Sequence, residues 1–385
     1  MIKRSVAVVV GTRPEAIKMA PVYLALQADP GTEVRMLATA QHRELLDQVL
    51  SVFGIEVALD LDLMRSGQPL WDLTARSITA IQKVLAEWKP DAVLVHGDTT
   101  TCLAAALAAF YERIRVGHVE AGLRTYDLEA PWPEEMNRRL VDPISRWCFA
   151  PTERAAENLR SERIPEERIF VTGNTVIDAL SLVRGWARDA VPEIPGLSPA
   201  ALAHRRLILI TGHRRESFGA PLEELCLALR DIAREFQDTA LVYPVHLNPR
   251  VQEPVRRILG DEERIFLIPP LPYLPFVELM DRSYLIITDS GGIQEEAPSL
   301  CKPVLVTRGT TERPEAVEAG VARLVGTDRG TIVAEARRLL SDRAAYERMA
   351  RGGNPYGDGK ASQRIVGILR EELTAAARAP RRAEG

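Results

Sequence analysis

Short apolar runs rich in β-branched residues alternate with longer helical patterns along the whole chain of 385 residues. The runs are apolar on both faces, which is typical of strands in a parallel sheet that helices cover on both sides. The first series of predicted strands covers residues 5–10, 34–39, 92–96, 116–119 and a run from 149 onward. Helical patterns over 14–27 and 99–112 lie between them. The pattern therefore predicts an α/β fold with a doubly wound parallel sheet.

The strand pattern stops at a proline-rich interval, VPEIPGLSP at residues 191–199, and then starts again. The second series of predicted strands covers residues 207–210, 240–243, 265–268, 285–288, 304–307 and 322–325. A chain of this length is also too long for one ordinary domain. We therefore expect two Rossmann-like doubly wound domains with a cleft between them. The N-terminal domain is expected to cover 1–175, with a C-terminal helix of 362–380 packed on it, and the second domain 176–361.

Charge and composition favour neither a nucleic-acid nor a membrane partner. Lys and Arg number 49 and Asp and Glu 53, a net charge of −4, and the apolar runs are shorter than the roughly 18–20 residues that span a bilayer. The first apolar run continues into GTRPE without a small-residue cleavage site, which indicates a strand rather than a signal peptide. Four widely spaced cysteines without a C-x-x-C pair are predicted to be reduced core residues of a cytoplasmic protein. They are Cys102, Cys148, Cys226 and Cys301.

Carboxylates follow the predicted strands of the N-terminal domain. Asp98 in HGDTTT follows one strand, and Glu120 in HVEAGLRT follows the next. Glu134 begins a predicted helix in PWPEEMNRR and shares a helix face with Arg138, four residues later. As alternatives, Asp98 could simply cap a helix, and Glu134 could lie in a solvated first turn. Because ligands bind at the carboxyl ends of parallel strands, the three carboxylates together indicate an acid/base site.

Glycines and basic residues follow predicted strands in both domains. The segments are GTRPEAIK at 11–18 with Arg13, TGHRRESFG at 211–219 with His213, and DSGGIQEE at 289–296. Backbone N–H groups at such helix starts can face a phosphate, and Arg313 adds positive charge nearby. Solvated surface charge is the alternative for the first two segments. Together with the carboxylates, these segments indicate a cleft for a nucleoside diphosphate sugar.

No cofactor or metal is expected. The G-x-G-x-x-G fingerprint of dinucleotide-binding folds is absent after every predicted strand, which argues against bound NAD. Four histidines that follow or end strands lack the close spacing of metal ligands. They are His96, His118, His213 and His246.

The whole chain resembles the non-hydrolysing UDP-N-acetylglucosamine 2-epimerases. The resemblance rests on many long motifs in the same order, among them GTRPEAIKMAP, VLVHGDTTT, HVEAGLRT, PWPEEMNR, TGNTVIDAL, TGHRRESFG, YLPFVELM and DSGGIQEEAPSLCKPVLVTR. It implies two domains of glycosyltransferase-B type, the second of which binds UDP, and a homodimer. It also implies interconversion of UDP-GlcNAc and UDP-ManNAc at a step of cell-surface polysaccharide biosynthesis.

The resemblance also implies roles for individual residues. The implied acid/base groups are Asp98, Glu120 and Glu134, with His213 close by. The implied UDP-sugar ligands are Arg13, Lys18, Arg138, His213, Phe276, Ser290, Gly291, Gly292, Glu296 and Arg313. Leu271 stands where other members often have glutamine, so a uracil contact there is expected through the backbone.

Some members of this family are activated by a second UDP-GlcNAc, and the resemblance suggests Gln41, Glu44 and His246 as allosteric candidates. Gln41 matches those members. Glu44 and Gly67 stand where some of them have glutamine and arginine, which argues against allosteric activation here.

The chemistry favours elimination of UDP over oxidation of the sugar. The C2 proton is not next to a carbonyl, and oxidation at C3 would need bound NAD. Breaking the anomeric C–O bond instead makes C1 cation-like and C2–H acidic, so that a carboxylate can remove the proton to give 2-acetamidoglucal. UDP then adds back while a proton reaches the other face of C2.

Other functions remain open at this point. A 2-epimerase of a diacetamido uronic acid would need an additional arginine for the sugar carboxylate, such as Arg124 or Arg215. A glycosyltransferase of the same fold would need an acceptor, and a hydrolysing epimerase would release free ManNAc. A UDP-sugar sensor would need the anion site but not the three carboxylates.

Overall fold

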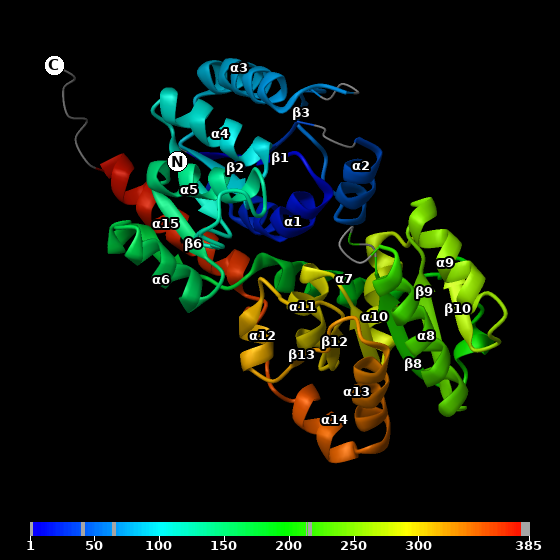
Figure 1. Ribbon diagram of the computed structural model, residues 1–385. Coiled ribbons are helices and arrows are strands. Elements are labelled where there is room, and N and C mark those ends of the chain that lie inside the picture. The colour runs from blue at the N-terminus through cyan, green and yellow to red at the C-terminus, as the bar shows by residue number, and fades with distance from the viewer. Residues whose placement is uncertain (1–2, 40–42, 64–66, 213, 215–217, 379–385) are drawn as a thin grey trace. The chain divides into compact units, whose positions relative to one another are not determined.

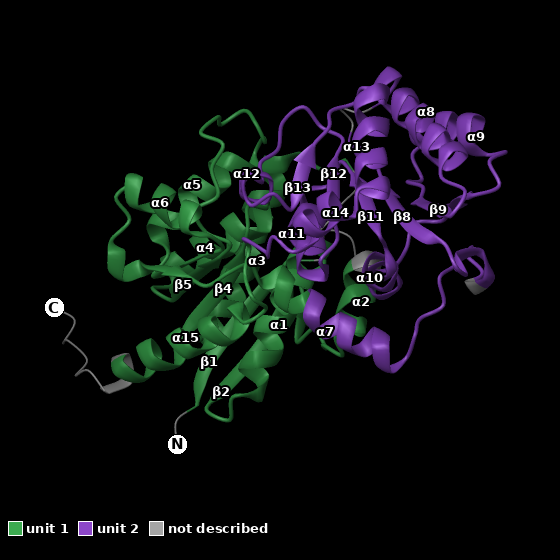
Figure 2. Ribbon diagram, turned by 90° about the horizontal axis from the view of Figure 1, so that it is seen from below, with its two compact units in different colours: residues 1–179, 356–385 green, residues 180–355 purple. Residues whose placement is uncertain are grey.

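The computed structural model describes residues 3–39, 43–63, 67–212, 214 and 218–378. The chain divides into two compact units, shown in different colours in Figure 2. Unit 1 consists of Met1–Ala179 and Tyr356–Gly385, and unit 2 of Leu180–Pro355. The chain therefore leaves unit 1 inside helix α7 (Thr175–Asp189) and returns to it before helix α15 (Ala361–Arg378).

The described part of unit 1 contains a seven-stranded parallel sheet in the order β3-β2-β1-β4-β5-β6-β7. Its strands are β1 (Arg4–Val10), β2 (Thr32–Ala38), β3 (Leu59–Asp60), β4 (Ala92–His96), β5 (Arg115–Val119), β6 (Trp147–Ala150) and β7 (Ile169–Val171). Its helices, besides α15, are α1 (Arg13–Ala28), α2 (Arg43–Val52), α3 (Leu70–Trp88), α4 (Thr100–Tyr111), α5 (Glu134–Ile144) and α6 (Glu153–Ser161). Helices α3, α4 and α5 pack side by side, while α1 packs against α2 and α15 (Figure 1).

The described part of unit 2 contains a six-stranded parallel sheet in the order β10-β9-β8-β11-β12-β13. Its strands are β8 (Arg206–Thr211), β9 (Thr239–Pro244), β10 (Ile265–Ile268), β11 (Leu285–Thr288), β12 (Val304–Val306) and β13 (Ala322–Leu324). Its helices are α8 (Ala220–Glu235), α9 (Pro249–Leu259), α10 (Tyr273–Arg282), α11 (Gly291–Glu296), α12 (Pro314–Glu318), α13 (Arg329–Ser341) and α14 (Arg343–Ala350). Each unit is thus a Rossmann-like α/β unit of the glycosyltransferase-B type, and the predicted fold class is confirmed.

The strand order reverses between β1 and β4 in unit 1 and between β8 and β11 in unit 2. In open parallel sheets this reversal opens a crevice beyond the carboxyl ends of the strands, where ligands bind. The interior of each sheet is apolar, and residues such as Val8 and Leu94 have no exposed surface. The fold therefore leaves the turns that follow β1, β4, β8 and β11 as the places for polar chemistry.

Two features differ from the sequence-based expectations. Cys301 is exposed, whereas Cys102, Cys148 and Cys226 are buried as expected. Cys301 ends a short 3-10 helix in the left-handed conformation, with φ of 58°, which turns it out of the core. The second difference is that the expected strands omit β3 and β7, which have only two and three residues. Among the described helices, none is long and apolar enough to cross a membrane.

Gly122 lies where β5 leads into the loop toward α5, and it leaves no room for a side chain. Its φ is +84°, and a Cβ there would lie 2.2 Å from the carbonyl oxygen of Ala155 on α6. We expect Gly122→Ala to destabilise the protein by about 3–5 kcal/mol, because it combines a left-handed backbone with a clash against backbone atoms. Urea unfolding followed by circular dichroism measures the loss.

Gly54→Ala is the matched control, since Gly54 has φ of +64° but no atom within 4 Å of its Cβ position. Gly54→Ala should lower the free energy of unfolding only through its left-handed backbone conformation, by about 1–2 kcal/mol. Equal losses in the two variants would contradict the close packing at Gly122.

Candidate active site

The turn after β1 begins α1 and is held by a buried carboxylate. Thr12 is the N-cap of α1, and Glu15 completes a capping box with it. One Glu15 oxygen accepts hydrogen bonds from the backbone N–H groups of Gly11 (3.0 Å) and Thr12 (2.7 Å). The other accepts from the Thr99 hydroxyl at 2.6 Å. Glu15 therefore ties the turn after β1 to the turn after β4, and burial raises its pKa.

Glu120, immediately after β5, is buried and has an ion-pair partner. The same oxygen, Oε2, accepts hydrogen bonds from the Lys18 ammonium of α1 and from the Asn174 side-chain amide, the latter at 3.2 Å. Burial by itself raises the pKa of Glu120, but the charges of Lys18 and His96 outweigh it and hold the pKa well below its usual range. Glu120 is therefore ionised at neutral pH and can accept a proton.

The backbone of Glu120 is also unusual. Its φ is +68°, a left-handed conformation that a glutamate rarely adopts. Strained residues of this kind cluster at functional sites, where the surrounding contacts hold them in place. The conformation therefore supports the predicted role of Glu120.

His96 is the last residue of β4 and is almost fully buried, with 4% of its surface exposed. Neither ring nitrogen has a hydrogen-bond partner among the described residues, and Nε2 lies 3.7 Å from Oε2 of Glu120. A buried polar group without a partner is costly and needs an explanation. The sequence had suggested His96 only as a conceivable metal ligand. Its place as the first residue of HGDTTT, two residues before Asp98, was the signal that could have placed it beside the predicted acid/base groups.

Asp98, after β4, is held by two residues of α5. Arg138 donates to its carboxylate Oδ2, and the Asn137 amide donates to its backbone oxygen at 2.7 Å. About a quarter of the Asp98 side chain, 24%, remains exposed. The structure therefore brings Asp98 and Arg138 together, and the carboxylate stays accessible.

The acidic partner of Arg138 on α5 is Glu135 rather than Glu134. Arg138 donates to Glu135 Oε2 at 3.1 Å, and Glu135 is fully buried. Glu135 also accepts from the backbone N–H groups of Thr125 (3.1 Å) and Tyr126 (3.0 Å). Glu134 begins α5 and is half-buried. The i,i+3 spacing in EEMNR was the sequence signal for Glu135.

In unit 2, the turn after β11 leads into α11. Ser290 is the N-cap of this helix, but its side chain makes no capping hydrogen bond. A Cβ added to Gly291 would lie 3.4 Å from the Arg313 guanidinium and 3.7 Å from that of Arg214. Two cations therefore flank a glycine turn whose backbone is open to close approach, as an anion site requires.

Each of these cations has a carboxylate nearby. Arg313 Nε donates to Glu295 at 2.8 Å, and Arg214 lies 3.7 Å from Glu312. Glu312 accepts two hydrogen bonds from Arg308, which lower its pKa to about 2. The carboxylates keep the positive charges in place.

Glu296 lies at the end of α11 and is buried. It accepts a hydrogen bond from the Tyr273 hydroxyl of α10 at 2.8 Å. Phe276 on α10 is half-buried, and Leu271 in the preceding loop is buried. The predicted ligands of unit 2 thus gather around β11 and α10.

A sequence profile of UDP-N-acetylglucosamine 2-epimerases matches residues 24–370 of the chain. The chain is 57% identical to the UDP-N-acetylglucosamine 2-epimerase of Salmonella typhimurium over 372 residues, which are 95% of this chain and 98% of that protein. It is also similar to the crystal structure of the Neisseria meningitidis enzyme bound to UDP-GlcNAc, with a TM-score of 0.87 and 49% identity over 95% of this chain and 100% of the other. The Methanocaldococcus jannaschii enzyme in complex with UDP-GlcNAc and UDP has a TM-score of 0.77 and 34% identity, over 95% and 99% of the two chains.

The chain belongs to the UDP-N-acetylglucosamine 2-epimerase family. It is therefore an isomerase, and the resemblance found in its motifs is confirmed.

Some residues predicted for this epimerase fall outside the described structure. His213, Arg215 and Gln41 lie outside the described residues, and the side chain of Glu44 on α2 is not described. His246 is exposed, and its Nδ1 accepts a hydrogen bond from the Asn248 backbone at 3.1 Å. The roles of these residues stay predictions.

The ion pair of Lys18 and Glu120 gives the epimerase a pH-dependent contribution to stability. Because the folded pKa of Glu120 is depressed, its ionised form stabilises the fold above the pKa of unfolded glutamate, and this is lost as pH falls through the folded pKa. Lys18→Met leaves a buried carboxylate without its cation, so we expect a loss of about 3–5 kcal/mol at pH 7. Thermal unfolding of the wild-type protein and of Lys18→Met from pH 4 to 8 measures this loss of stability.

The loss in Lys18→Met should grow as pH rises, because the unpaired Glu120 then has a raised pKa and resists ionisation. The double variant Lys18→Met/Glu120→Gln should lose this pH dependence. A deficit that stays constant from pH 4 to 8 would contradict the pairing.

Proposed function

We propose that this enzyme interconverts UDP-N-acetylglucosamine and UDP-N-acetylmannosamine by inverting C2, without releasing free sugar. The observation that carries the proposal is the buried Glu120 carboxylate, which pairs with Lys18 and lies next to the strand turn that bears Asp98. The named activity of the relatives and the UDP-GlcNAc bound to the Neisseria meningitidis enzyme support the substrate. We assign the proton transfers to unit 1 and the nucleotide to unit 2.

In the proposed mechanism, the anomeric C–O bond breaks first. Its electron pair leaves with the β-phosphate oxygen of UDP, and C1 becomes cation-like. A carboxylate takes the C2 proton, and the electrons of the C–H bond form the C1–C2 double bond of 2-acetamidoglucal. To complete the inversion, a proton is delivered to the opposite face of C2, and the UDP oxygen bonds to C1 again.

The groups around the turns suit these steps. In one direction of the reaction, Glu120 takes the C2 proton and Asp98 gives a proton to the opposite face of C2. In the reverse direction the two carboxyl groups exchange these roles. Glu134 is retained as a third acid/base candidate, and His213 as a group near the diphosphate. The Ser290–Gly292 turn, with Arg313, stabilises the negative charge that develops on the departing UDP. Arg13, Lys18, Arg138, Phe276, Leu271 and Glu296 complete the proposed substrate contacts.

The uronic-acid alternative loses one of its two candidate arginines, while Arg215 lies outside the described residues. It needs an arginine for the sugar carboxylate, and Arg124 was one candidate. The Arg124 side chain has no exposed surface and pairs with Asp142 (2.6 Å) and Glu162 (2.7 Å). Arg124 is therefore committed to protein carboxylates.

Three buried free thiols support the proposal that the enzyme acts in the reducing cytoplasm.

The decisive experiment is NMR of the purified enzyme with UDP-GlcNAc in deuterated water. We expect both epimers, each carrying deuterium at C2, and no free ManNAc. An ¹⁸O label in the bridging position should scramble into the diphosphate. A glycosyltransferase would instead show product only after an acceptor is added, and inversion without deuterium entry or scrambling would exclude the elimination.

Asp98→Asn and Glu120→Gln should each lower turnover by about two orders of magnitude or more, the scale of one acid/base group. The same NMR assay measures the rates. Glu129→Gln, which removes an exposed carboxylate of unit 1, is the control and should retain the normal rate. Near-normal turnover in both site variants would refute the assignment.

We further propose that the enzyme is a homodimer assembled through unit 1. Phe110 and Tyr111, at the end of α4, are 51% and 68% exposed and line a groove of about 510 Å³ with Pro143 and Ile144 of α5. Four arginines also line this groove, and exposed aromatic side chains together with arginine are typical of a protein interface.

Light scattering should give twice the mass of one chain, and the double variant Phe110→Asp/Tyr111→Asp should give the monomer mass. Leu247→Asp changes an equally exposed apolar residue of unit 2 and should leave the dimer intact. A monomeric wild-type protein would contradict the proposal.

A further inference from the structure

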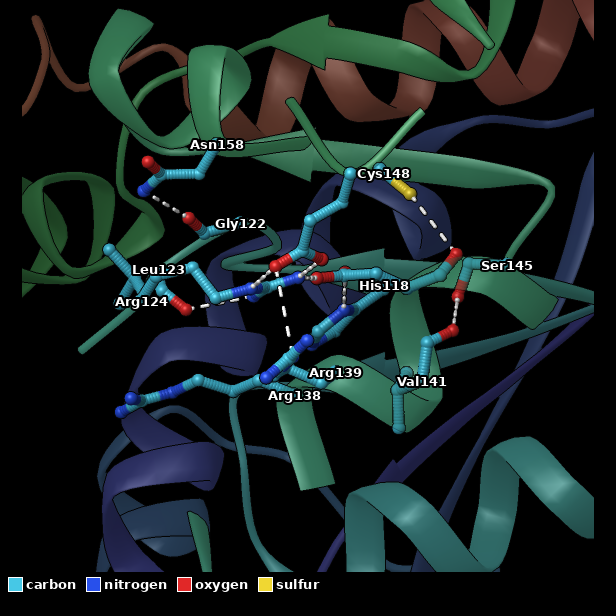
Figure 3. A network of polar contacts seen from close by, with 12 residues as sticks. His118, Gly122, Leu123, Arg124, Arg138, Arg139, Val141, Ser145, Cys148 and Asn158 are labelled. Atoms are coloured by element: carbon cyan, nitrogen blue, oxygen red, sulfur yellow. Dashed lines mark hydrogen bonds and ion pairs between the residues drawn. The ribbon is translucent and has the colours of Figure 1, made fainter. Parts of the chain in front are cut away.

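A buried row of charged side chains of alternating sign leads to the turn that carries Asp98. It begins at Glu162, just after α6, and continues through Arg124 and Asp142 to His118 on β5. Figure 3 labels Arg124 and His118 within this network of polar contacts. The side chains of Arg124, Asp142 and His118 have no exposed surface. The Glu162 side chain is partly exposed, but the proposed reaction does not use the three buried residues directly, so their burial calls for another explanation.

His118 contacts an acceptor with each ring nitrogen. Nδ1 lies 2.6 Å from Oδ1 of Asp142, and Nε2 lies 2.7 Å from the backbone oxygen of Gly97. A carbonyl oxygen only accepts hydrogen bonds, so Nε2 must carry a proton. The proton on Nδ1 depends on the charge of Asp142.

Asp142 is ionised in this setting. Its second oxygen accepts from Arg124 at 2.6 Å, and arginine is always protonated. Burial raises the pKa of Asp142, but the hydrogen bonds and positive charge around it, including those of Arg124, lower the pKa below its ordinary value. A neutral His118 would place the Nδ1 lone pair against a carboxylate oxygen, whereas an imidazolium donates to it.

Two thiols also lie against this pair. Cys102 of α4 donates to the Gly97 oxygen at 3.3 Å, and Cys148 of β6 donates to the Asp142 backbone oxygen at 3.6 Å. Burial raises both thiol pKa values well above the usual range, so both stay neutral. The charge on His118 is therefore balanced by Asp142, which Arg124 and Glu162 support in turn.

The atom that His118 holds belongs to the turn between β4 and α4. Gly97 has φ of +65°, its N–H donates to the Val119 oxygen at 2.9 Å, and its Cβ position lies 3.7 Å from Oε1 of Glu120. Asp98 follows it directly. Fixing the Gly97 carbonyl therefore fixes the peptide plane from which Asp98 projects.

We propose that His118 is a positioning residue that donates a hydrogen bond from each ring nitrogen and so holds the Gly97–Asp98 turn, which keeps the Asp98 carboxylate in its place relative to Glu120. Asp142, Arg124 and Glu162 supply and orient its counter-charge. The importance for turnover rests on the proposed role of Asp98, but the protonation of His118 does not.

The protonation is tested by NMR of the wild-type protein with ¹⁵N-labelled histidine at pH 7.5. His118→Gln assigns the signals by their loss. We expect protons on both ring nitrogens of His118, in slow exchange with water. A non-protonated Nδ1 would overturn the proposal, and this result is independent of any activity.

The positioning role is tested by a graded series of variants. His118→Gln should lower kcat by about tenfold to a hundredfold, the scale of a small misplacement of a reacting group, with KM changed less than twofold. Asp142→Asn should have a smaller effect, and Glu162→Gln the smallest.

Glu166→Gln is the matched control for Glu162→Gln, because Glu166 pairs with Arg160 at an exposed position of the same region. It should leave kcat unchanged. If His118→Gln fails to fold, the kcat of Glu162→Gln tests the positioning role, and the NMR spectrum of the wild-type protein tests the protonation of His118. Unchanged kcat in His118→Gln would overturn the positioning role. A normal kcat in Asp98→Asn would instead refute the proposed function and leave the charge state standing.

Discussion

The buried ion pair between Lys18 and Glu120 is the contact around which the site-bearing edge of unit 1 is arranged. A carboxylate buried without a cation would take up a proton or destabilise the fold. Lys18 comes from α1, while Asn174, which precedes α7, contacts the same carboxylate oxygen. One atom therefore joins three segments that are far apart in the sequence. The same contacts hold the left-handed backbone of Glu120 and keep its carboxylate ready to accept a proton.

In unit 2, unlike in unit 1, the cations of the candidate site keep part of their surface exposed. Arg313 and Arg214 flank the Gly291 turn, and their side chains are 18% and 33% exposed. Glu295 and Glu312 lie beside them and orient them before any ligand arrives. Such preorganisation lowers the entropy lost when an anion binds. The arrangement of unit 2 therefore suits nucleotide binding, and that of unit 1 suits proton transfer.

The sequence predicts most of this fold because strands buried on both faces form continuous apolar runs. β4, β10 and β11 begin and end at the predicted residues. β3 and β7 are too short to give such a signal. Asp98 and Glu120 were predictable because each follows a strand. The missing hydrogen-bond partners of His96 depend on tertiary packing, which no spacing in the sequence reveals. The choice of Glu135 over Glu134 as the partner of Arg138 likewise depends on which side of α5 faces the core.

Helix α5 explains why the position of Asp98 depends on contacts so distant in the sequence. Asn137 and Arg138 on this helix bind Asp98 itself, and Asp142, one turn later, orients the His118 that binds the preceding carbonyl. A shift of α5 would disturb all three contacts together, so the turn cannot move independently of the helix. Buried ionic groups contribute little net stability compared with apolar packing, but they define geometry when every donor and acceptor is matched. Because Glu134 is the first residue of the same helix, the contacts that fix Asp98 also determine where Glu134 lies.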